Sequence, residues 1–418
     1  MNRLRKTGAL VLALITLVVL LTAACAPAST PAPASTQSAA PAAKAPSGDP
    51  YKVGFVNSFS GYMAAMGALT RETINLLEPK INADGGINGR PLKIITYDDE
   101  SDETKGVLAI KKLIEADQVH AIVGMNASGV VLATVPTMQQ AQIPYVSVAA
   151  TRDMLKPPSD WIFKLPNSEG FIIEGWYRYA AKQGWKKLAL MTPDSGWGKA
   201  AKAYLENTVQ QHGITIVANE TYGPTDTDMR AQLTKIKGAG ADVLLVGGAE
   251  PAGAMAISQA KGLDFKIPST GFHSITMPAI MSVKELSDGL EGLIFTGHKP
   301  TVYRDLPDSD RMKKGIVQLA SMLTSSSKRD ITAFDGFASD SLMLVVDALK
   351  RANPDPTKVV DTRKAIKTAL EQTKDFVGVS NIVNYTPTDH EGMNLEAGIV
   401  AQVKGGAFKL ITTLDALK

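Results

Sequence analysis

The stretch of residues 121–151 constrains the fold more strongly than any other part of the chain. A short apolar segment, 121–123, precedes a helical pattern that begins near Ser128, and a second apolar segment follows at 145–148. Short, fully apolar segments on either side of an amphipathic helix are typical of a parallel sheet, whose strands are covered by helices on both faces. The stretch therefore predicts an α/β fold built on parallel strands.

The start of the helix within this stretch is a candidate anion site. Ser128 stands at the predicted N-cap, after a strand that ends in small residues. The first amides of a helix lack intrahelical partners and lie at the positive end of its dipole. Because ligands of open parallel sheets bind at the carboxyl ends of strands, we expect Ser128 to help bind a carboxylate.

The same alternation of strand and helix occurs twice along the chain. Residues 51–151 predict strands alternating with helices, and a second set runs from about 161 to 296. Right-handed crossovers make each set a parallel sheet. Pro166–Ser168 and Gly297–Thr301 fall where a chain would pass between two such bodies, so we expect hinges there.

Composition fits a large soluble protein and gives no sign of nucleic-acid binding. The chain has 418 residues, 44% apolar and 20% charged, which exceeds an ordinary single domain. Its formal excess of three positive charges comes from Arg3, Arg5 and Lys6. Without residues 1–24, Lys plus Arg falls from 44 to 41 and equals the 41 Asp plus Glu. We find no basic face and expect no nucleic-acid partner.

The N-terminal segment has the features of an export signal. A basic start is followed by an apolar run at 9–21, too short to span a membrane comfortably, and by small residues before Cys25. This pattern resembles a bacterial lipoprotein signal, so we expect removal of 1–24 and lipidation of Cys25. Residues 25–50, rich in Ala, Pro, Ser and Thr, predict a disordered tether to the membrane surface, facing the periplasm or the cell exterior.

No catalytic or metal-binding pattern is found. The sequence has no Gly-x-Ser-x-Gly elbow, phosphate-binding loop or dinucleotide fingerprint, and its five His residues lack metal-ligand spacing. Cys25 is the only cysteine, which excludes an intrachain disulfide. The acidic run 98–102 is interpreted as a loop and helix start rather than a cation site. We expect no enzyme, no cofactor and no metal.

Ordered motifs along the chain resemble one known family. They are Val53-Gly54-Phe55 with Ser60-Gly61, the segments 81–90 and 97–99, Ala121-Ile122-Val123-Gly124, 143–151, Gly196-Trp197-Gly198 and Gly247-Gly248. The chain resembles the substrate-binding proteins of branched-chain amino acid and amide ABC importers, the Leu/Ile/Val-binding type. The resemblance implies the type I periplasmic-binding architecture, with two Rossmann-like lobes joined by three hinge crossings. The N-terminal lobe would comprise 51–167 and about 300–385, and the C-terminal lobe 168–299 and about 386–418.

The resemblance implies an intact carboxylate half of the binding site. In the family, a Ser hydroxyl at a helix start, backbone amides and a Thr after the next strand bind the ligand's α-carboxylate. These positions match Ser128, Ala149 and Thr151. Asn126 and Ala127 are expected at the rim of the cleft.

The other half of the site departs from the family pattern. Branched-chain amino acid binders place an acidic residue near the ligand's ammonium group, where this chain has His273, after Phe272. Met66 and Ala249 replace aromatic residues, whereas Trp197 keeps an aromatic wall. Glu250 or Asp335 could supply the missing negative charge in a different geometry. Phe334 and Phe337 are candidates for the pocket wall or for the core.

The function implied is capture of a small carboxylate ligand, of the branched-chain amino acid or amide class, by closure of the lobes. Delivery to an ABC permease with its ATPase subunits would follow, with the protein acting as a lipid-anchored monomer. Because His273 cannot neutralise an ammonium group, an amine-free aromatic or aliphatic carboxylate is the alternative ligand. A ligand sensor or receptor domain is the alternative class.

Overall fold

A computed structural model describes residues 44–156, 159–248 and 250–417 of the chain. These residues belong to one compact unit, Ala43–Lys418. The predicted signal at 1–24, Cys25, the tether up to residue 43 and the candidate Ala249 lie outside the described residues.

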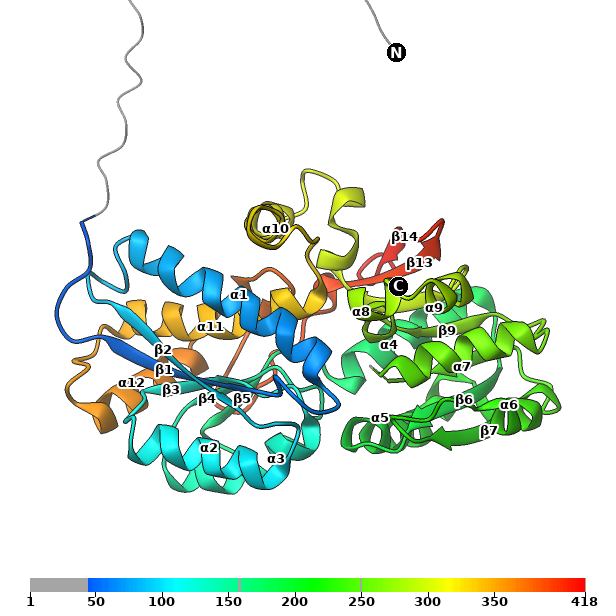
Figure 1. Cartoon of the computed structure of the whole chain (residues 1–418), viewed down its shortest axis with the longest axis horizontal. Helices are drawn as coiled ribbons and strands as arrows, with labels where there is room; N and C mark the ends of the chain where they lie inside the picture. The colour runs from blue at the N-terminus through cyan, green and yellow to red at the C-terminus, as the bar shows by residue number, and fades with distance from the viewer. Residues whose placement is uncertain (1–43, 157–158, 249, 418) are drawn as a thin grey trace, which may run out of the picture. The chain divides into compact units, whose positions relative to one another are not determined.

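The first sheet is parallel throughout and has the strand order β2-β1-β3-β4-β5 (Figure 1). Its strands are β1 (Tyr51–Asn57), β2 (Leu92–Asp98), β3 (Ala121–Gly124), β4 (Tyr145–Ser147) and β5 (Ile162–Lys164). Residues 121–124 and 145–147 are buried, as their apolar character predicts. The parallel arrangement expected from the 121–151 stretch is confirmed.

Helices cover both faces of this sheet (Figure 1). On one face, α1 (Ala64–Ala83) and α11 (Ala333–Ala352) share a core with side chains such as Phe55 and Val123. On the other face, α2 (Glu103–Glu115) and α3 (Ser128–Gln140) pack on the alternate side chains of the strands. α12 (Val359–Glu371) packs against α11.

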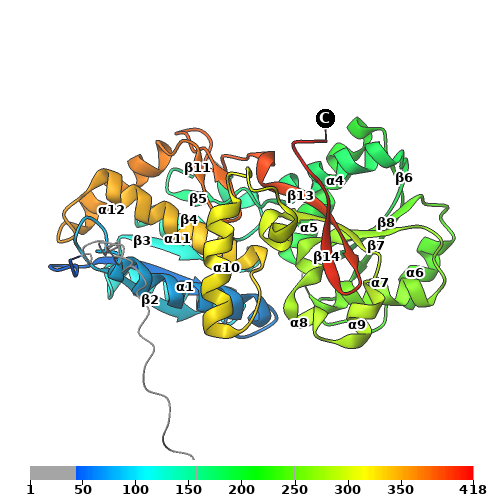
Figure 2. The same cartoon turned by 90° about the horizontal axis from the view of Figure 1, so that it is seen from above.

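The second sheet has seven strands in the order β14-β13-β10-β9-β8-β6-β7. The strands from β10 to β7 in this order are parallel, whereas β13 and β14 form an antiparallel hairpin at one edge, seen in red in Figure 2. The bounds are β6 (Lys187–Pro193), β7 (Thr215–Tyr222), β8 (Val243–Val246), β9 (Ser269–Phe272), β10 (Ile294–His298), β13 (Gly398–Lys404) and β14 (Ala407–Thr413).

Helices also cover both faces of the second sheet. One face packs on α4 (Glu169–Gln183) and α5 (Gly196–Thr208). Four helices pack on the other face: α6 (Arg230–Lys237), α7 (Pro251–Gly262), α8 (Pro278–Met281) and α9 (Lys284–Gly289). Each sheet with its helices therefore forms one Rossmann-like lobe.

The chain passes between the two sheets three times. The first crossing joins β5 to α4 through residues 165–168. The second follows β10 through a 3-10 helix, Lys299–Asp305, and α10 (Lys313–Ser327) to α11. The third leaves the small hairpin of β11 (Phe376–Val377) and β12 (Ile382–Val383) and reaches β13. Two lobes with three crossings are the type I periplasmic-binding architecture that the sequence predicted.

Two local expectations are modified by the structure. Helix α3 begins one residue earlier than predicted: Ala127 is its N-cap, in extended conformation, and Ser128 is its first helical residue. In the acidic run, Asp102 caps α2 by accepting from the Lys105 amide, as expected, but Asp99 is fully buried and accepts from the Ser58 hydroxyl.

Within residues 44–156, 159–248 and 250–417, no helix is both long enough and apolar enough to cross a membrane.

Candidate ligand-binding site

A cavity of about 80 Å³ lies between the two lobes. The carboxyl ends of strands and the starts of helices in both lobes line it, as expected for open parallel sheets. From the first lobe and α11 come Tyr62, Met63, Met66, Asn126, Ala127, Ser128, Val148, Ala150, Phe334 and Phe337, and from the first crossing and the second lobe come Asn167, Ile172, Ser195, Gly196, Trp197, Gly248, Glu250, His273 and Ser274.

The start of α3 opens onto this cavity without a side-chain cap. Helices α4, α5 and α11 are capped by the side chains of Ser168, Ser195 and Thr332. At α3 the N-cap is Ala127, which has no side chain able to accept a hydrogen bond. The amides of its first turn are therefore available to an acceptor from a ligand, next to the hydroxyl of Ser128.

Asn126 adds a donor beside these amides. Its side chain is 5% exposed, and its Oδ1 accepts from the Ser58 amide at 3.4 Å. Its backbone N–H donates to Asn57 Oδ1 at 2.8 Å, which holds the residue in place. Among the described residues, its Nδ2 has no hydrogen-bond partner. A buried amide donor without a partner at the wall of a cavity is well suited to bind a ligand oxygen.

The start of α5, in the second lobe, lies close to the start of α3. A Cβ atom on Gly196 would lie only 3.2 Å from the backbone nitrogen of Gly129, so glycine allows the two helix starts to approach closely. The next residue, Trp197, lines the cavity and packs edge-on against Phe272, with ring centroids 5.8 Å apart. The predicted aromatic wall at Trp197 is thus supported by a fully buried ring behind it.

His273 belongs to a group of packed rings. Its ring centroid lies 5.3 Å from those of His298 and Phe334 and 5.8 Å from that of Phe337. Burial lowers the pKa of His273 to about 4. Burial, with the nearby His273, also lowers the pKa of His298 well below its ordinary value. Both imidazoles are therefore neutral at pH 7. We refer to His273, His298, Phe334 and Phe337 as the ring cluster.

Glu250 contributes an acidic side chain to the cavity wall. It stands at the N-cap of α7 and is 6% exposed. Burial raises the pKa of Tyr222, and the nearby charge of Glu250 raises it further. The Tyr222 hydroxyl donates a hydrogen bond to the Gly247 carbonyl. The second lobe therefore offers one carboxylate near the cavity, although not at the position where the family pattern expects it.

The structure brings together most of the residues predicted for the site. Asn126, Ala127, Ser128, Met66, Trp197, Glu250 and His273 all line the cavity. Ala149 and Thr151 lie on either side of Ala150, which lines it in their place. The Ala149 amide donates to the Ser147 hydroxyl at 3.1 Å, and the Thr151 hydroxyl accepts from the Asp153 amide. Phe272 lies behind Trp197.

Asp335 does not line the cavity. Its carboxylate accepts two hydrogen bonds from Arg329, at 2.9 and 2.7 Å, and one from the Thr73 hydroxyl at 2.8 Å. It also forms a capping box with Thr332 at the start of α11. With these partners Asp335 has a structural role, in which its carboxylate links α11 to α1.

Several lining residues were not predicted from the sequence. They are Tyr62, Met63, Val148, Ala150, Asn167, Ile172, Ser195, Gly196, Gly248 and Ser274. Most lie within a few residues after the end of a strand, so their position relative to the sheet was the signal that could have identified them. Asn167 lies in the first crossing, where the sequence indicated a hinge but not a polar contact.

The chain matches a known protein family. Residues 50–407 match the family model described as periplasmic binding protein. The Leu/Ile/Val-binding protein homolog 7 of Brucella suis biovar 1 is 26% identical over 214 residues, which cover 49% of this chain and 53% of that protein. The chain thus spans about half the length of the curated relatives it matches.

Solved structures share the whole fold. An extracellular ligand-binding receptor from Rhodopseudomonas palustris HaA2 superposes with a TM-score of 0.80 at 23% identity, covering 87% of this chain and all of that one. The branched-chain amino acid transporter substrate binding protein LivJ from Streptococcus pneumoniae, in complex with isoleucine, gives 0.73 at 24% identity, covering 87% and 99%. These relatives are named as binding proteins or receptors, which agrees with the prediction of a non-enzyme. The family model spans both lobes and the cavity between them, and the chain belongs to the periplasmic binding protein family.

Proposed function

We propose that this protein is the extracytoplasmic solute-binding component of an ABC importer and that its ligand carries a carboxylate. The observation that supports this most strongly is the uncapped start of α3 at the cavity. The Ser128 hydroxyl, the first-turn amides and Asn126 Nδ2 would bind the carboxylate oxygens, and the loop with Ala149 and Thr151 would complete the site.

The ligand that we propose first is an amino acid of the class bound by branched-chain amino acid and amide importers. One similar protein is named a Leu/Ile/Val-binding protein homolog, and another was solved in complex with isoleucine. Glu250 would then interact with the ammonium group, because it is an acidic residue of the second lobe that lines the cavity.

An amine-free carboxylate is the second candidate. The ring cluster favours it, since His273 is neutral and packs among Phe334 and Phe337. Such a wall suits an aliphatic or aromatic tail better than a charged group.

Ligand capture would proceed by closure of the lobes about the three crossings. We propose an N-terminal lobe of 51–167 and about 300–385 and a C-terminal lobe of 168–299 and about 386–418. A ligand that contacts both lobes favours the closed arrangement, and that arrangement would be the one recognised by the permease. The protein would act as a monomer, tethered to the membrane by a lipid on Cys25.

A thermal-shift panel tests this proposal. It compares isoleucine, leucine and valine with 4-methylpentanoate and phenylacetate, and each carboxylate with its neutral amide. A ligand at a hundred times its Kd stabilises the native state by about 2.7 kcal/mol. We expect stabilisation by carboxylates and not by the matching amides. Stabilisation by carboxylates and amides alike would contradict the carboxylate site.

A further inference from the structure

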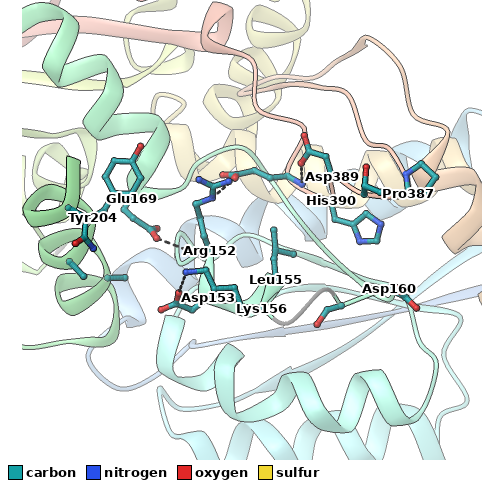
Figure 3. Close-up of a pocket in the computed structure, with 16 residues that line it drawn as sticks. Arg152, Asp153, Leu155, Lys156, Asp160, Glu169, Tyr204, Pro387, Asp389 and His390 are labelled. Atoms are coloured by element: carbon teal, nitrogen blue, oxygen red, sulfur yellow. Dashed lines mark hydrogen bonds and ion pairs between the residues drawn. The ribbon is translucent and has the colours of Figure 1, made fainter. Parts of the chain in front are cut away.

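The loop 148–152 lies between two cavities. Val148 and Ala150 line the cavity between the lobes, whereas Arg152 lines a separate groove of about 640 Å³. Figure 3 shows this groove, with Arg152 between Glu169 and the segment that carries Asp389 and His390. Ala149 and Thr151 lie within the loop, so the contacts that fix its two ends also fix these two residues.

The first end of the loop is held by a residue of the first crossing. The Val148 carbonyl accepts a hydrogen bond from Asn167 Nδ2 at 2.8 Å. Asn167 Oδ1 in turn accepts from Lys164 Nζ at 3.2 Å, and Lys164 Nζ also donates to the Leu165 carbonyl at 2.8 Å. Lys164 is completely buried at the end of β5. A buried ammonium group thus orients the amide that holds the loop.

The second end is held by two buried carboxylates. The Arg152 amide donates to Glu169 Oε1 at 3.2 Å, and Glu169 is 4% exposed. The Arg152 guanidinium Nε lies 2.8 Å from Glu391 Oε2. Glu391 is 2% exposed, and its Oε1 lies 3.5 Å from Lys164 Nζ. The two ends are therefore joined through Lys164, Glu391 and Arg152.

These groups come from different parts of the fold. Lys164 and Arg152 belong to the first lobe, Glu169 is the first residue of α4 in the second lobe, and Glu391 lies in the third crossing. Burial raises the pKa of Glu169, and the charge of Lys164 opposes that rise. Burial lowers the pKa of Lys164, opposed by Glu391 and Glu169. The buried Lys164 and the partly exposed Arg152 balance the two buried carboxylates, so the removal of one charge leaves another without its full complement of partners.

We propose that the network of Lys164, Asn167, Glu391, Arg152 and Glu169 positions the loop 148–152, and that Glu169 couples this loop to the second lobe. When the lobes separate, the hydrogen bond from the Arg152 amide to Glu169 is the contact that must break. The conformation of the loop then depends on the arrangement of the lobes. The coupling to ligand affinity rests on the proposed function, whereas the positioning of the loop does not.

Hydrogen exchange of the ligand-free protein tests the positioning, with Glu169→Ala and Glu169→Gln as the pair of variants. Glutamine retains an oxygen that accepts from the Arg152 amide, and alanine does not. We expect exchange across 149–153 to rise about tenfold in Glu169→Ala and to stay near the wild-type rate in Glu169→Gln. Lys156→Gln is the control, since it removes only an exposed ion pair with Asp153 in the same groove. Unchanged exchange in Glu169→Ala would overturn the proposal.

A second variant covers the case in which Glu169→Ala fails to fold. The Arg152 side chain is 44% exposed, so Arg152→Gln removes the contact with Glu391 at little risk to the fold. We expect faster exchange across 149–153 there too, and rescue by Arg152→Lys. An exchange rate in Arg152→Gln equal to that of wild type would count against the network.

Titrations with isoleucine and 4-methylpentanoate, followed by isothermal titration calorimetry, test the coupling to the ligand. We expect Glu169→Ala to raise Kd about tenfold for the probe that binds, and Glu169→Gln to restore most of the affinity. An unchanged Kd together with faster exchange would overturn the coupling and leave the positioning intact. If neither probe binds the wild type, the proposed ligand class fails, and the exchange result still decides the positioning.

Discussion

The start of α3 and the ring cluster form two contrasting parts of the same cavity. At α3, the amides of the first turn, the Ser128 hydroxyl and Asn126 Nδ2 offer donors and no charge. In the ring cluster, packed aromatic rings surround a neutral imidazole. Donors at a helix start favour any carboxylate, whereas the rings select what is attached to it. From this comparison we expect the two parts to contribute separately to affinity and specificity.

The largest effect is expected from Asn126→Asp. Aspartate keeps the oxygen that accepts from the Ser58 amide and replaces the Nδ2 donor with a negative charge. A lost hydrogen bond to a charged group and a new repulsion together cost about 3 kcal/mol or more, over a hundredfold in Kd. Calorimetric titration with a carboxylate ligand measures this change.

Asn207→Asp is the control for this variant, because it adds the same charge on an exposed part of α5. Equal loss of affinity in both variants would show that net charge, rather than the donor at Asn126, determines binding.

The neutrality of His273 predicts a pH dependence of stability. In the unfolded chain this histidine gains a proton near pH 6.5, but in the native state only near pH 4. The unfolded state therefore binds more protons between these values, and stability falls as the pH drops from 6.5 towards 4. Between pH 7 and pH 4.5 the contribution of His273 is about 2 kcal/mol.

His273→Phe should reduce this loss, because phenylalanine keeps the ring packing and cannot be protonated. Urea unfolding of both proteins at pH 7 and pH 4.5 measures the difference. The same loss of stability in both would contradict a neutral His273 in the ring cluster.

Glu250→Gln separates the two ligand candidates. If Glu250 interacts with an ammonium group, its replacement weakens binding of isoleucine by about 1–2 kcal/mol and leaves 4-methylpentanoate unaffected. Titrations of both ligands against both proteins provide the measurement. An equal loss of affinity for both ligands would indicate that Glu250 has a structural role beside Tyr222.

The fold was largely predictable from the sequence because its signals are local. Fully apolar segments such as 121–124 and 145–147 are buried strands, and the helices between them have one apolar face. The start of α3 was predicted one residue too late, since Ser128 is a better capping residue than Ala127. The structure places Ser128 in the first turn, where its hydroxyl is free of the capping role.

The parts of the site that the sequence did not predict depend on contacts between distant segments. Asp335 is bound by Thr73, which is 262 residues away. Asn167 reaches the cavity because Lys164 and Glu391 orient it, and Glu391 belongs to the third crossing. The sequence also could not show that Ala150, rather than Ala149, lines the cavity. Strand β4 ends at Ser147, so the alternation of side chains between the two faces of the sheet does not extend to these residues.

The affinity of Ser128→Ala for a carboxylate ligand tests the central claim most directly. The variant removes one hydroxyl at the start of α3 and leaves the amides and the ring cluster in place. If a carboxylate binds there, calorimetry will show a loss of about 1–3 kcal/mol for the carboxylate, with little change for a neutral amide. Wild-type affinity for the carboxylate in Ser128→Ala would contradict the account.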